Sequence, residues 1–285
     1  MARTPGEETA TVWYSAIMTS RDILLAPAPP ADARVAYGAE PQQFGDLRLP
    51  LGQGLHPVVM AIHGGFWRAG FELVYMGHLC EALRAAGVAT WNVEYRRVGE
   101  PGGAWPGTFE DIARAADHLR ALAPRHDLDL TRVVTLGHSS GGHLALWLAA
   151  RPRIPAASPL YTPEPLPLRA AVSLAGVVDL REAYRRDLGD GAVRELMGDG
   201  PDNYPARYAT ASPAALLPLG VPQTLVHGTA DDRVPYALSH DYHALAIARG
   251  DDARLVTLPD ADHFTLVTPD TAESATVLDT TLALL

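Results

Sequence analysis

A serine stands between glycines at positions 137–142, which read Gly-His-Ser-Ser-Gly-Gly. This segment directly follows an apolar run and precedes a helical pattern. Glycines on either side of Ser139 permit a sharp turn from a strand into a helix, and such a turn points the central hydroxyl into a cleft. The pattern predicts Ser139 as a nucleophile and the backbone N–H of Ser140 as a donor to a negatively charged oxygen. The alternative interpretation is a glycine-rich turn with an incidental serine.

A second glycine pair follows another apolar run, at positions 63–67, which read His-Gly-Gly-Phe-Trp. Acyl transfer passes through a tetrahedral intermediate whose negative oxygen is stabilised by fixed backbone N–H groups. A glycine pair allows the backbone to present those groups without an intruding side chain. The segment therefore predicts an oxyanion hole made by the N–H groups of Gly65, Phe66 and Ser140, with His63 bracing the loop. An ordinary Gly-Gly turn is the alternative.

A serine hydroxyl is a weak nucleophile and needs a neighbouring base. Two later apolar runs end in suitable groups: Asp231 follows the run 223–226, and His263 follows the run 253–258. We expect His263 to be the base and Asp231 to orient it. Asp232 is an alternative acid, or else a solvated turn residue beside Arg233.

The chain has 11 histidines, and most are expected to be structural. His138 and His143 flank Ser139 and are expected to point away from it, and His227 is expected to support the turn that carries Asp231. His240 and His243 share a predicted helix, without the further Cys or His spacing of a zinc site. We predict no metal and no cofactor, since neither a phosphate loop nor a dinucleotide fingerprint is present.

Short apolar runs alternate with helical periods along the chain, a pattern typical of right-handed βαβ units. The first two predicted strands are an antiparallel edge pair with one solvent-facing side, because the second alternates apolar and polar residues. The predicted strands are 34–37, 44–49, 57–62, 89–93, 132–136, 170–174, 223–226 and 253–258. The predicted helices are 72–86, 109–122, 142–150, 236–248 and 270–284.

The pattern of strands and helices predicts an N-terminal arm followed by one large domain. Residues 1–33 form the arm, with a short helix at 12–18, and residues 34–285 form the domain. Residues about 179–215 interrupt the alternation, which predicts a small cap insertion. Ligands bind beyond the carboxyl ends of parallel strands, so a cap at that edge would cover the site.

Composition excludes several classes of protein. The 285 residues carry a formal net charge of −10 and no basic run, which argues against nucleic acid and anionic membranes as partners. No signal peptide and no membrane span are predicted, so we expect a cytoplasmic protein. The single cysteine, Cys80, is expected to be a buried structural thiol. A homodimer in which the N-terminal arm packs on a neighbouring subunit is an open alternative.

These motifs, in this order, resemble the α/β-hydrolase superfamily from about residue 34 to the end. That resemblance implies an α/β-hydrolase fold, a mostly parallel central sheet flanked by helices, with the chain order Ser, acid, His. Hormone-sensitive-lipase-like esterases carry a third glycine where Phe66 stands. The chain looks more like kynurenine formamidases and related small bacterial acyl esterases in segments 63–67, 94–97, 105–106, 111 and 176–180. In those families Tyr95 and Arg96 would be architectural.

The prediction is a serine hydrolase that cleaves small carboxylic esters through an acyl-enzyme. An arylformamidase acting on N-formylkynurenine-like amides is the runner-up, with Trp67 and Trp105 contacting the aryl group. A non-catalytic relative that binds a small ligand is a further alternative. A peptidase related to prolyl oligopeptidases ranks low, because the chain has no room for their propeller domain.

Overall fold

The eight predicted strands form one sheet in the computed structural model, which describes residues 19–285. Their order across the sheet is β1-β2-β4-β3-β5-β6-β7-β8, and every neighbouring pair from β4 to β8 is parallel. The bounds are β1 Ala33–Ala36, β2 Phe44–Arg48, β3 His56–Ile62, β4 Ala89–Val93, β5 Leu128–His138, β6 Ala170–Leu174, β7 Gln223–Gly228 and β8 Ala253–Leu258.

The antiparallel edge is confirmed, since β2 pairs antiparallel with both β1 and β4. The predicted solvent-facing side of β2 is wrong. Its last four residues are buried, and Arg48 donates from Nη2 to the carbonyl oxygen of Pro29 at 2.6 Å. The chain preceding β1 therefore lies against β2, a contact that the alternation of β2 does not encode.

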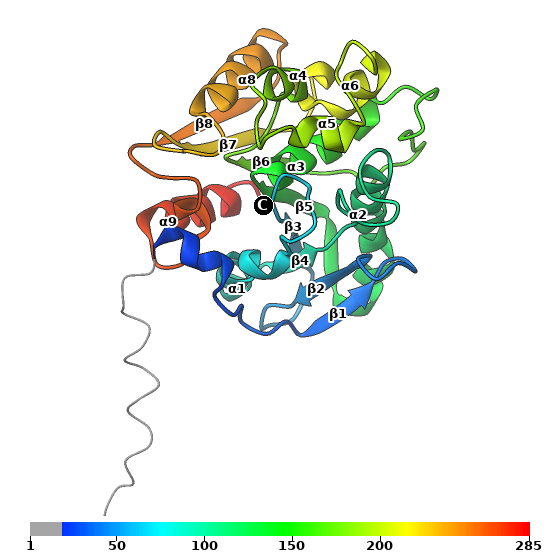
Figure 1. Ribbon diagram of the computed structural model, residues 1–285. Helices are drawn as coiled ribbons and strands as arrows, with labels where there is room; N and C mark the ends of the chain where they lie inside the picture. The colour runs from blue at the N-terminus through cyan, green and yellow to red at the C-terminus, as the bar shows by residue number, and fades with distance from the viewer. Residues whose placement is uncertain (1–18) are drawn as a thin grey trace, which may run out of the picture.

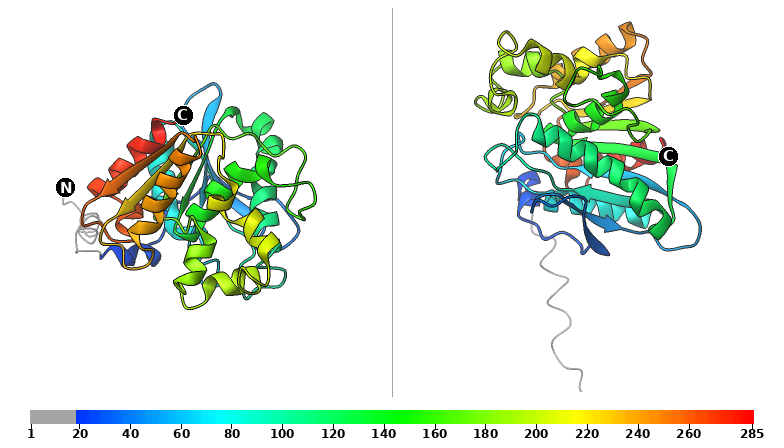
Figure 2. Two further views of the ribbon diagram at one scale, coloured as in Figure 1. Left: turned by 90° about the horizontal axis from the view of Figure 1, so that it is seen from above. Right: turned by 90° about the vertical axis from the view of Figure 1, so that its right-hand side faces the viewer.

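Side chains of the central strands alternate between two cores. In β3, Val58, Met60 and Ile62 belong to one buried cluster, while Val59 and Ala61 belong to the other. The first cluster includes residues of α2 (Gly107–His126), α3 (Ser140–Ala150) and α8 (Tyr236–Ala248), and the second includes residues of α1 (Gly77–Ala85) and α9 (Ala272–Leu282). Helices thus cover both faces of the sheet (Figures 1 and 2). The predicted helix 72–86 begins as a 3₁₀ turn, η3 (Leu73–Met76).

The segment between β6 and β7 contains four short helices, at the top of Figure 1. They are α4 (Leu180–Arg185), α5 (Ala192–Met197), α6 (Pro205–Ala211) and α7 (Pro213–Leu216). This is where the sequence predicts a cap. Arg68, after β3, binds this segment through Glu195, with an Nε–Oε2 distance of 2.6 Å. The four helices are therefore tied to the loop that carries Gly65.

Part of the N-terminal arm packs on the domain. The 3₁₀ helix η2 (Ser20–Leu24) buries Ile23 completely, and the hydroxyl of Ser20 donates to Oδ2 of Asp262 at 2.6 Å. The helix predicted at 12–18 lies outside the described residues. Cys80 is buried, as predicted. Between residues 19 and 285, no helix combines the length and apolar character needed to span a bilayer.

Candidate active site

Ser139 occupies the turn between β5 and α3. Its backbone is left-handed, with φ 58° and ψ −123°, a strained conformation for a residue with a side chain. Two flanking glycines make the turn sterically feasible. A Cβ on Gly137 would lie 2.0 Å from the carbonyl oxygen of Gly141, and one on Gly141 would lie 2.1 Å from that of Ile62. The turn thus holds Ser139 at the carboxyl end of β5, where its side chain lines a cavity.

His263 and Asp231 form a hydrogen-bonded pair beside this turn. Nδ1 of His263 lies 2.7 Å from Oδ2 of Asp231, and both side chains are almost fully buried. The other carboxylate oxygen accepts the backbone N–H groups of Arg233 and Val234, each at 2.8 Å. Since the carboxylate can only accept, Nδ1 of His263 carries the proton and Nε2 is free to act as a base.

The pKa of Asp231 supports the ionised form. Burial raises the pKa of this carboxyl group, but hydrogen bonds from His227 and His263 outweigh that effect and place it below its ordinary value. Asp232, the alternative acid, has a side chain that is 70% exposed and lies 3.5 Å from Nε of Arg233. Asp231 is therefore the carboxylate that holds His263.

Ser139 and His263 line one cavity of about 150 Å³. Among the described residues the Ser139 hydroxyl makes no hydrogen bond, so it is available to a ligand. Hydrogen bonds between nucleophile and base are often long in ligand-free sites and shorten when substrate binds. The arrangement brings a hydroxyl, an imidazole and a buried carboxylate to the same edge of the sheet.

The loop after β3 lines the same cavity through Gly65 and Phe66. Gly65 and Phe66 line the cavity in left-handed conformations, with φ 110° and 52°. Within residues 19–285 neither backbone N–H has an acceptor. Ser140 is the first residue of α3, where an N–H has no acceptor within the helix. The sequence predicts these three N–H groups as an oxyanion hole; Gly65 and Phe66 line the cavity, whereas Ser140 follows the lining residue Ser139 and is not itself in the lining.

Tyr75 and His138 connect this loop to His263. The sequence alone did not indicate a functional role for either side chain. The hydroxyl of Tyr75 accepts the N–H of Gly64 at 2.6 Å and donates to Nδ1 of His138 at 2.9 Å. Nε2 of His138 then donates to the carbonyl oxygen of His263 at 2.9 Å. One series of hydrogen bonds therefore joins the loop after β3, the turn at Ser139 and the loop that carries His263.

The prediction that His138 points away from the site is wrong. It lines the cavity, and its ring centroid lies 4.6 Å from that of His263. Burial, followed by the nearby His263, lowers the pKa of His138 to about 3, so the ring is neutral. Burial also raises the pKa of Tyr75, which keeps its hydroxyl protonated. The only sequence feature that could have identified His138 as part of the site is its position beside Ser139 in the turn.

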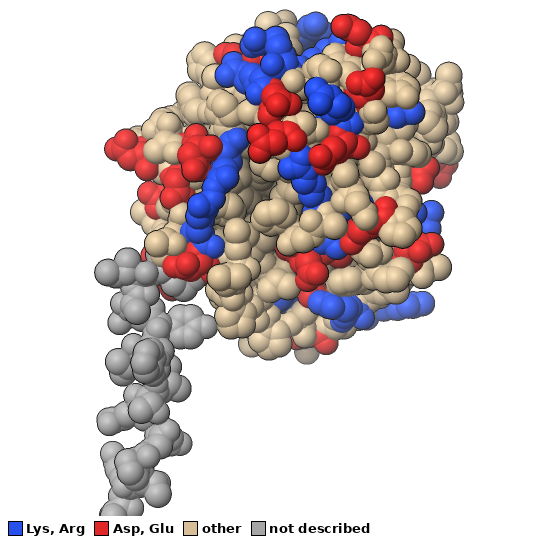
Figure 3. Space-filling model, viewed as in Figure 1, with Lys and Arg blue, Asp and Glu red and all other residues tan. Residues whose placement is uncertain are grey.

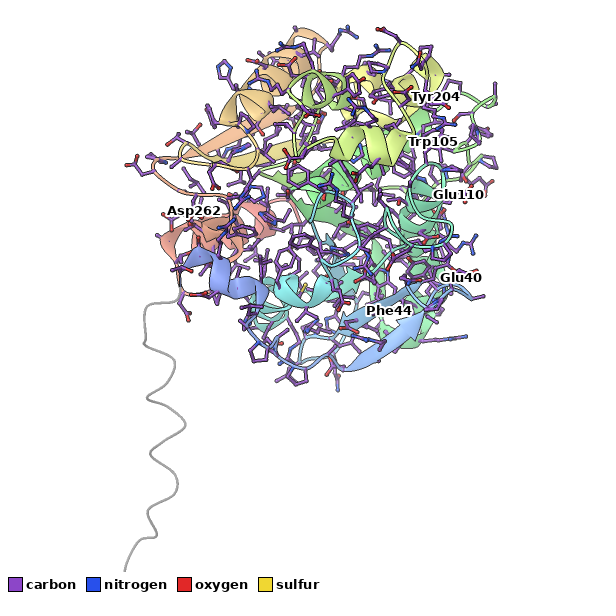
Figure 4. The ribbon with its side chains drawn as sticks, in the orientation of Figure 1. Glu40, Phe44, Trp105, Glu110, Tyr204 and Asp262 are labelled. Atoms are coloured by element: carbon purple, nitrogen blue, oxygen red, sulfur yellow. The ribbon has the colours of Figure 1, made fainter. Side chains whose placement is uncertain are left out.

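Trp67 and Trp105 do not line this cavity, contrary to the expected substrate contacts. Trp67 is fully buried and packs edge-on against His143, with ring centroids 5.2 Å apart. Trp105 borders a separate pocket with Arg207. The guanidinium of Arg207 lies 5.9 Å from the ring centroid of Trp105 and 3.8 Å from that of Tyr204, and Figure 4 shows both aromatic residues far from Asp262, which precedes His263. Sequence proximity to the glycines after β3 does not reveal that the tryptophan following Phe66 turns into the core.

The other residues predicted to be structural form buried contacts. His63 contacts Glu94 through Nε2 at 2.9 Å and stacks on Tyr95, which bonds to the carbonyl oxygen of His63. Arg96 binds Asp111 through Nε and Nη2, at 2.8 and 2.7 Å. Asp262 caps the turn after His263 by accepting two backbone N–H groups.

Within residues 19–285, there is no group of three or more His, Cys, Asp or Glu side chains that could hold a metal ion.

Comparison with solved structures shows the predicted fold. A truncated carbohydrate esterase from gut microbiota superposes with a TM-score of 0.77 and 21% identity, covering 90% of this chain and 98% of that one. Esterase B from Lactobacillus rhamnosis also scores 0.77, with 20% identity and coverage of 93% and 90%. A butyrate-bound esterase from Thermogutta terrifontis scores 0.73, with 21% identity and coverage of 90% and 94%. The chain therefore has an α/β-hydrolase fold.

Sequence comparison adds a curated relative and a family. Esterase LipQ from Mycobacterium tuberculosis (strain ATCC 25618 / H37Rv) is 26% identical over 218 residues, which cover 73% of this chain. They cover 50% of LipQ, so the chain spans about half the length of this relative. The family model named BD-FAE matches residues 46–245, which include Ser139 and Asp231. Since that match spans well over half of the sequence, the chain belongs to the BD-FAE family.

Proposed function

We propose that this chain is an esterase that hydrolyses small carboxylic esters through an acyl-enzyme on Ser139. The observation that carries the proposal is the 2.7 Å hydrogen bond between His263 and the buried Asp231, at a cavity that Ser139, Gly65 and Phe66 also line. Within residues 19–285 the Ser139 hydroxyl and the N–H groups of Gly65 and Phe66 have no hydrogen-bond partner. The esterase names of LipQ and of the solved structures support the same chemistry.

The proposed reaction has two halves. Oγ of Ser139 attacks the ester carbonyl carbon, and Nε2 of His263 takes the hydroxyl proton. The N–H groups of Gly65, Phe66 and Ser140 bind the oxyanion. The intermediate then collapses, the alkoxide leaves with the proton held by His263, and the acyl group remains on Ser139.

Water completes the cycle. His263 takes a proton from a water molecule that attacks the acyl-enzyme, and collapse of the second intermediate returns that proton to Oγ of Ser139. The acid leaves and the enzyme is regenerated. Asp231 stays ionised throughout and stabilises the imidazolium that forms twice per turnover.

The size of the cavity favours a short acyl group. About 150 Å³ accommodates a few carbon atoms beside the reacting carbonyl, and the Thermogutta esterase is described with butyrate, a four-carbon acid. Phe66, Phe71 and Phe264 line the cavity and supply apolar walls. The same three rings could stack on an aryl group, so an aryl formamide is the second candidate substrate. Trp67 and Trp105 would not contact it.

A substrate panel with a nucleophile variant tests the proposal. We expect the protein to hydrolyse p-nitrophenyl acetate and butyrate, and a fluorophosphonate probe to label it. Ser139→Ala should abolish both, whereas Ser140→Ala should keep labelling because Ser140 contributes a backbone N–H. Faster turnover of N-formylkynurenine than of either ester would favour the formamide candidate. Full activity in Ser139→Ala, or a complete lack of labelling of the unmodified protein, would overturn the mechanism and favour a ligand-binding relative.

A further inference from the structure

Two arginines line the cavity that holds Ser139 and His263. Arg21 and Arg233 belong to its lining, and among residues 19–285 no Asp or Glu does. Figure 3 shows basic side chains along one side of a hollow on this face of the molecule. The chain as a whole carries a net charge of −10, so two cations in the lining of one cavity are opposite in sign to the net charge of the protein.

Arg21 is held at the cavity by the segment that precedes the sheet. Ile23, two residues on, is fully buried, and Ser20 bonds to Asp262 at 2.6 Å, next to His263. The helix η2 is thus tied to the loop that carries His263. In the described part of the chain, no carboxylate lies within 4.0 Å of the Arg21 guanidinium.

Arg233 is positioned by the acid of the site. Its backbone N–H donates to Oδ1 of Asp231 at 2.8 Å, so its Cα is set by the same carboxylate that holds His263. Its side chain is 37% exposed, and the only carboxylate near it in residues 19–285 is that of Asp232, at 3.5 Å. That contact is longer than a charge-assisted hydrogen bond and leaves most of the guanidinium donors free.

We propose that the preferred esters carry a carboxylate, which Arg21 and Arg233 bind while Ser139 attacks the ester carbonyl. This inference rests on the proposed function and specifies its substrate class. A guanidinium presents a planar fork of donors that matches a carboxylate. Two such groups in a small cavity also raise the local concentration of an anion that the net charge of the protein otherwise repels. Phe71, Phe264 and Leu24 belong to the same lining and add apolar surface to the cavity.

The carboxylate belongs either to the acyl group or to the alcohol, and two matched substrate pairs separate these cases. Monomethyl succinate carries it on the acyl side, and its neutral counterpart is methyl succinamate. Acetoxyacetate carries it on the alcohol side, and its counterpart is acetoxyacetamide. Each pair replaces a carboxylate by an amide of nearly the same shape. Hydrolysis is followed by NMR of the released methanol or acetate.

For one of the two pairs we expect kcat/KM at low salt to be about 20-fold higher for the anion than for the amide. Arg21→Gln and Arg233→Gln should each lower this ratio of kcat/KM values about fivefold. Raising the NaCl concentration to about 0.5 M should lower it as well, because exposed charges are screened. Arg254→Gln, which alters an exposed arginine on β8 outside the cavity lining, should leave the ratio unchanged. The ratio corrects for any loss of folded protein, since misfolding lowers both rates equally.

Equal turnover of anion and amide in both pairs would overturn this inference while leaving the esterase proposal intact. A preference that survives in the Arg21→Gln, Arg233→Gln double variant would also overturn it. If no ester in either pair is hydrolysed and p-nitrophenyl acetate is also left intact, the proposed function itself fails. These results are distinct, so the two proposals are tested separately.

Discussion

Nε2 of His138 donates a hydrogen bond to the carbonyl oxygen of His263 across 2.9 Å, although the two residues are 125 positions apart in the chain. Through its other nitrogen, His138 accepts from Tyr75, which in turn accepts from Gly64. The carbonyl oxygen of His263 can only accept, so Nε2 of His138 carries the proton and Nδ1 accepts from the Tyr75 hydroxyl. The tautomer of His138 is therefore defined by its neighbours. The backbone positions of His263 and of the loop that carries Gly64 are thereby coupled.

Tyr75→Phe should lower kcat about tenfold with a smaller effect on KM. The substitution removes the acceptor of the Gly64 N–H and the donor to His138, so the adjacent amides of Gly65 and Phe66 are held less firmly where the oxyanion forms. It should also lower the free energy of unfolding by about 1–3 kcal/mol, because buried polar groups lose their partners. Steady-state kinetics and urea unfolding measure both effects.

The matched control is Tyr161→Phe. The side chain of Tyr161 is exposed, with 43% of its surface accessible, and it does not line the Ser139 cavity. We expect no change in kcat or in stability. A Tyr75→Phe variant that loses stability while keeping its kcat would show that the tyrosine supports the fold and not the oxyanion site.

Asp231→Asn and Asp232→Asn should differ by orders of magnitude in kcat. Asparagine at 231 can donate to His263, which favours the wrong tautomer, and such a change lowers kcat about 10⁴-fold in enzymes with this arrangement. At 232 the side chain is 70% exposed and does not bond to His263, so kcat should stay within about twofold. Comparable losses in the two variants would contradict the assignment of the acid.

Gly65→Ala should damage activity far more than Gly70→Ala. Both glycines have left-handed backbones, with φ 110° and 104°, so both substitutions strain the chain. A Cβ on Gly65 would lie 2.3 Å from Cβ of Phe71, whereas one on Gly70 would meet nothing within 4 Å. The loop must shift at position 65, and losing one oxyanion donor costs about 10²–10³ in kcat. Kinetics of the two variants, with unfolding midpoints for comparison, test this.

Acid should destabilise the protein before its carboxylates titrate. Burial lowers the pKa of His138 to about 3 and that of His143 to about 4, whereas an unfolded histidine titrates near 6.5. Between these values the unfolded state binds more protons, so stability falls as the pH drops from about 6.5 towards 4. Each histidine contributes a slope of up to about 1.4 kcal/mol per pH unit.

Urea unfolding at pH 7, 6, 5 and 4 measures that slope. His143→Gln should reduce it, because the buried ring that resists protonation is gone. His240→Gln is the control, since its side chain is 61% exposed, and the slope should not change. A stability that stays constant from pH 6.5 to 4 would rule out the neutral, buried state of both rings.

The sequence by itself determined the eight strands, the five longer helices and the edge of the sheet where Ser139, Asp231 and His263 lie. Burial on both faces makes a parallel strand a continuous apolar run, and the carboxyl ends of such strands share one edge. Residues directly after those runs therefore had to be near one another. The same local reasoning located the glycines of the turn and of the loop after β3, because a tight backbone turn demands them.

Only the tertiary structure decided the contacts between loops. Asp231 and Asp232 follow the same strand, and packing buried one and exposed the other. Trp67 follows Phe66 but turns into the core, while Arg21 reaches the cavity from a segment far away in the chain. The bonds of His138 to Tyr75 and His263 span 63 and 125 positions. No local period encodes such pairs, because they depend on how separate loops meet once the sheet has formed.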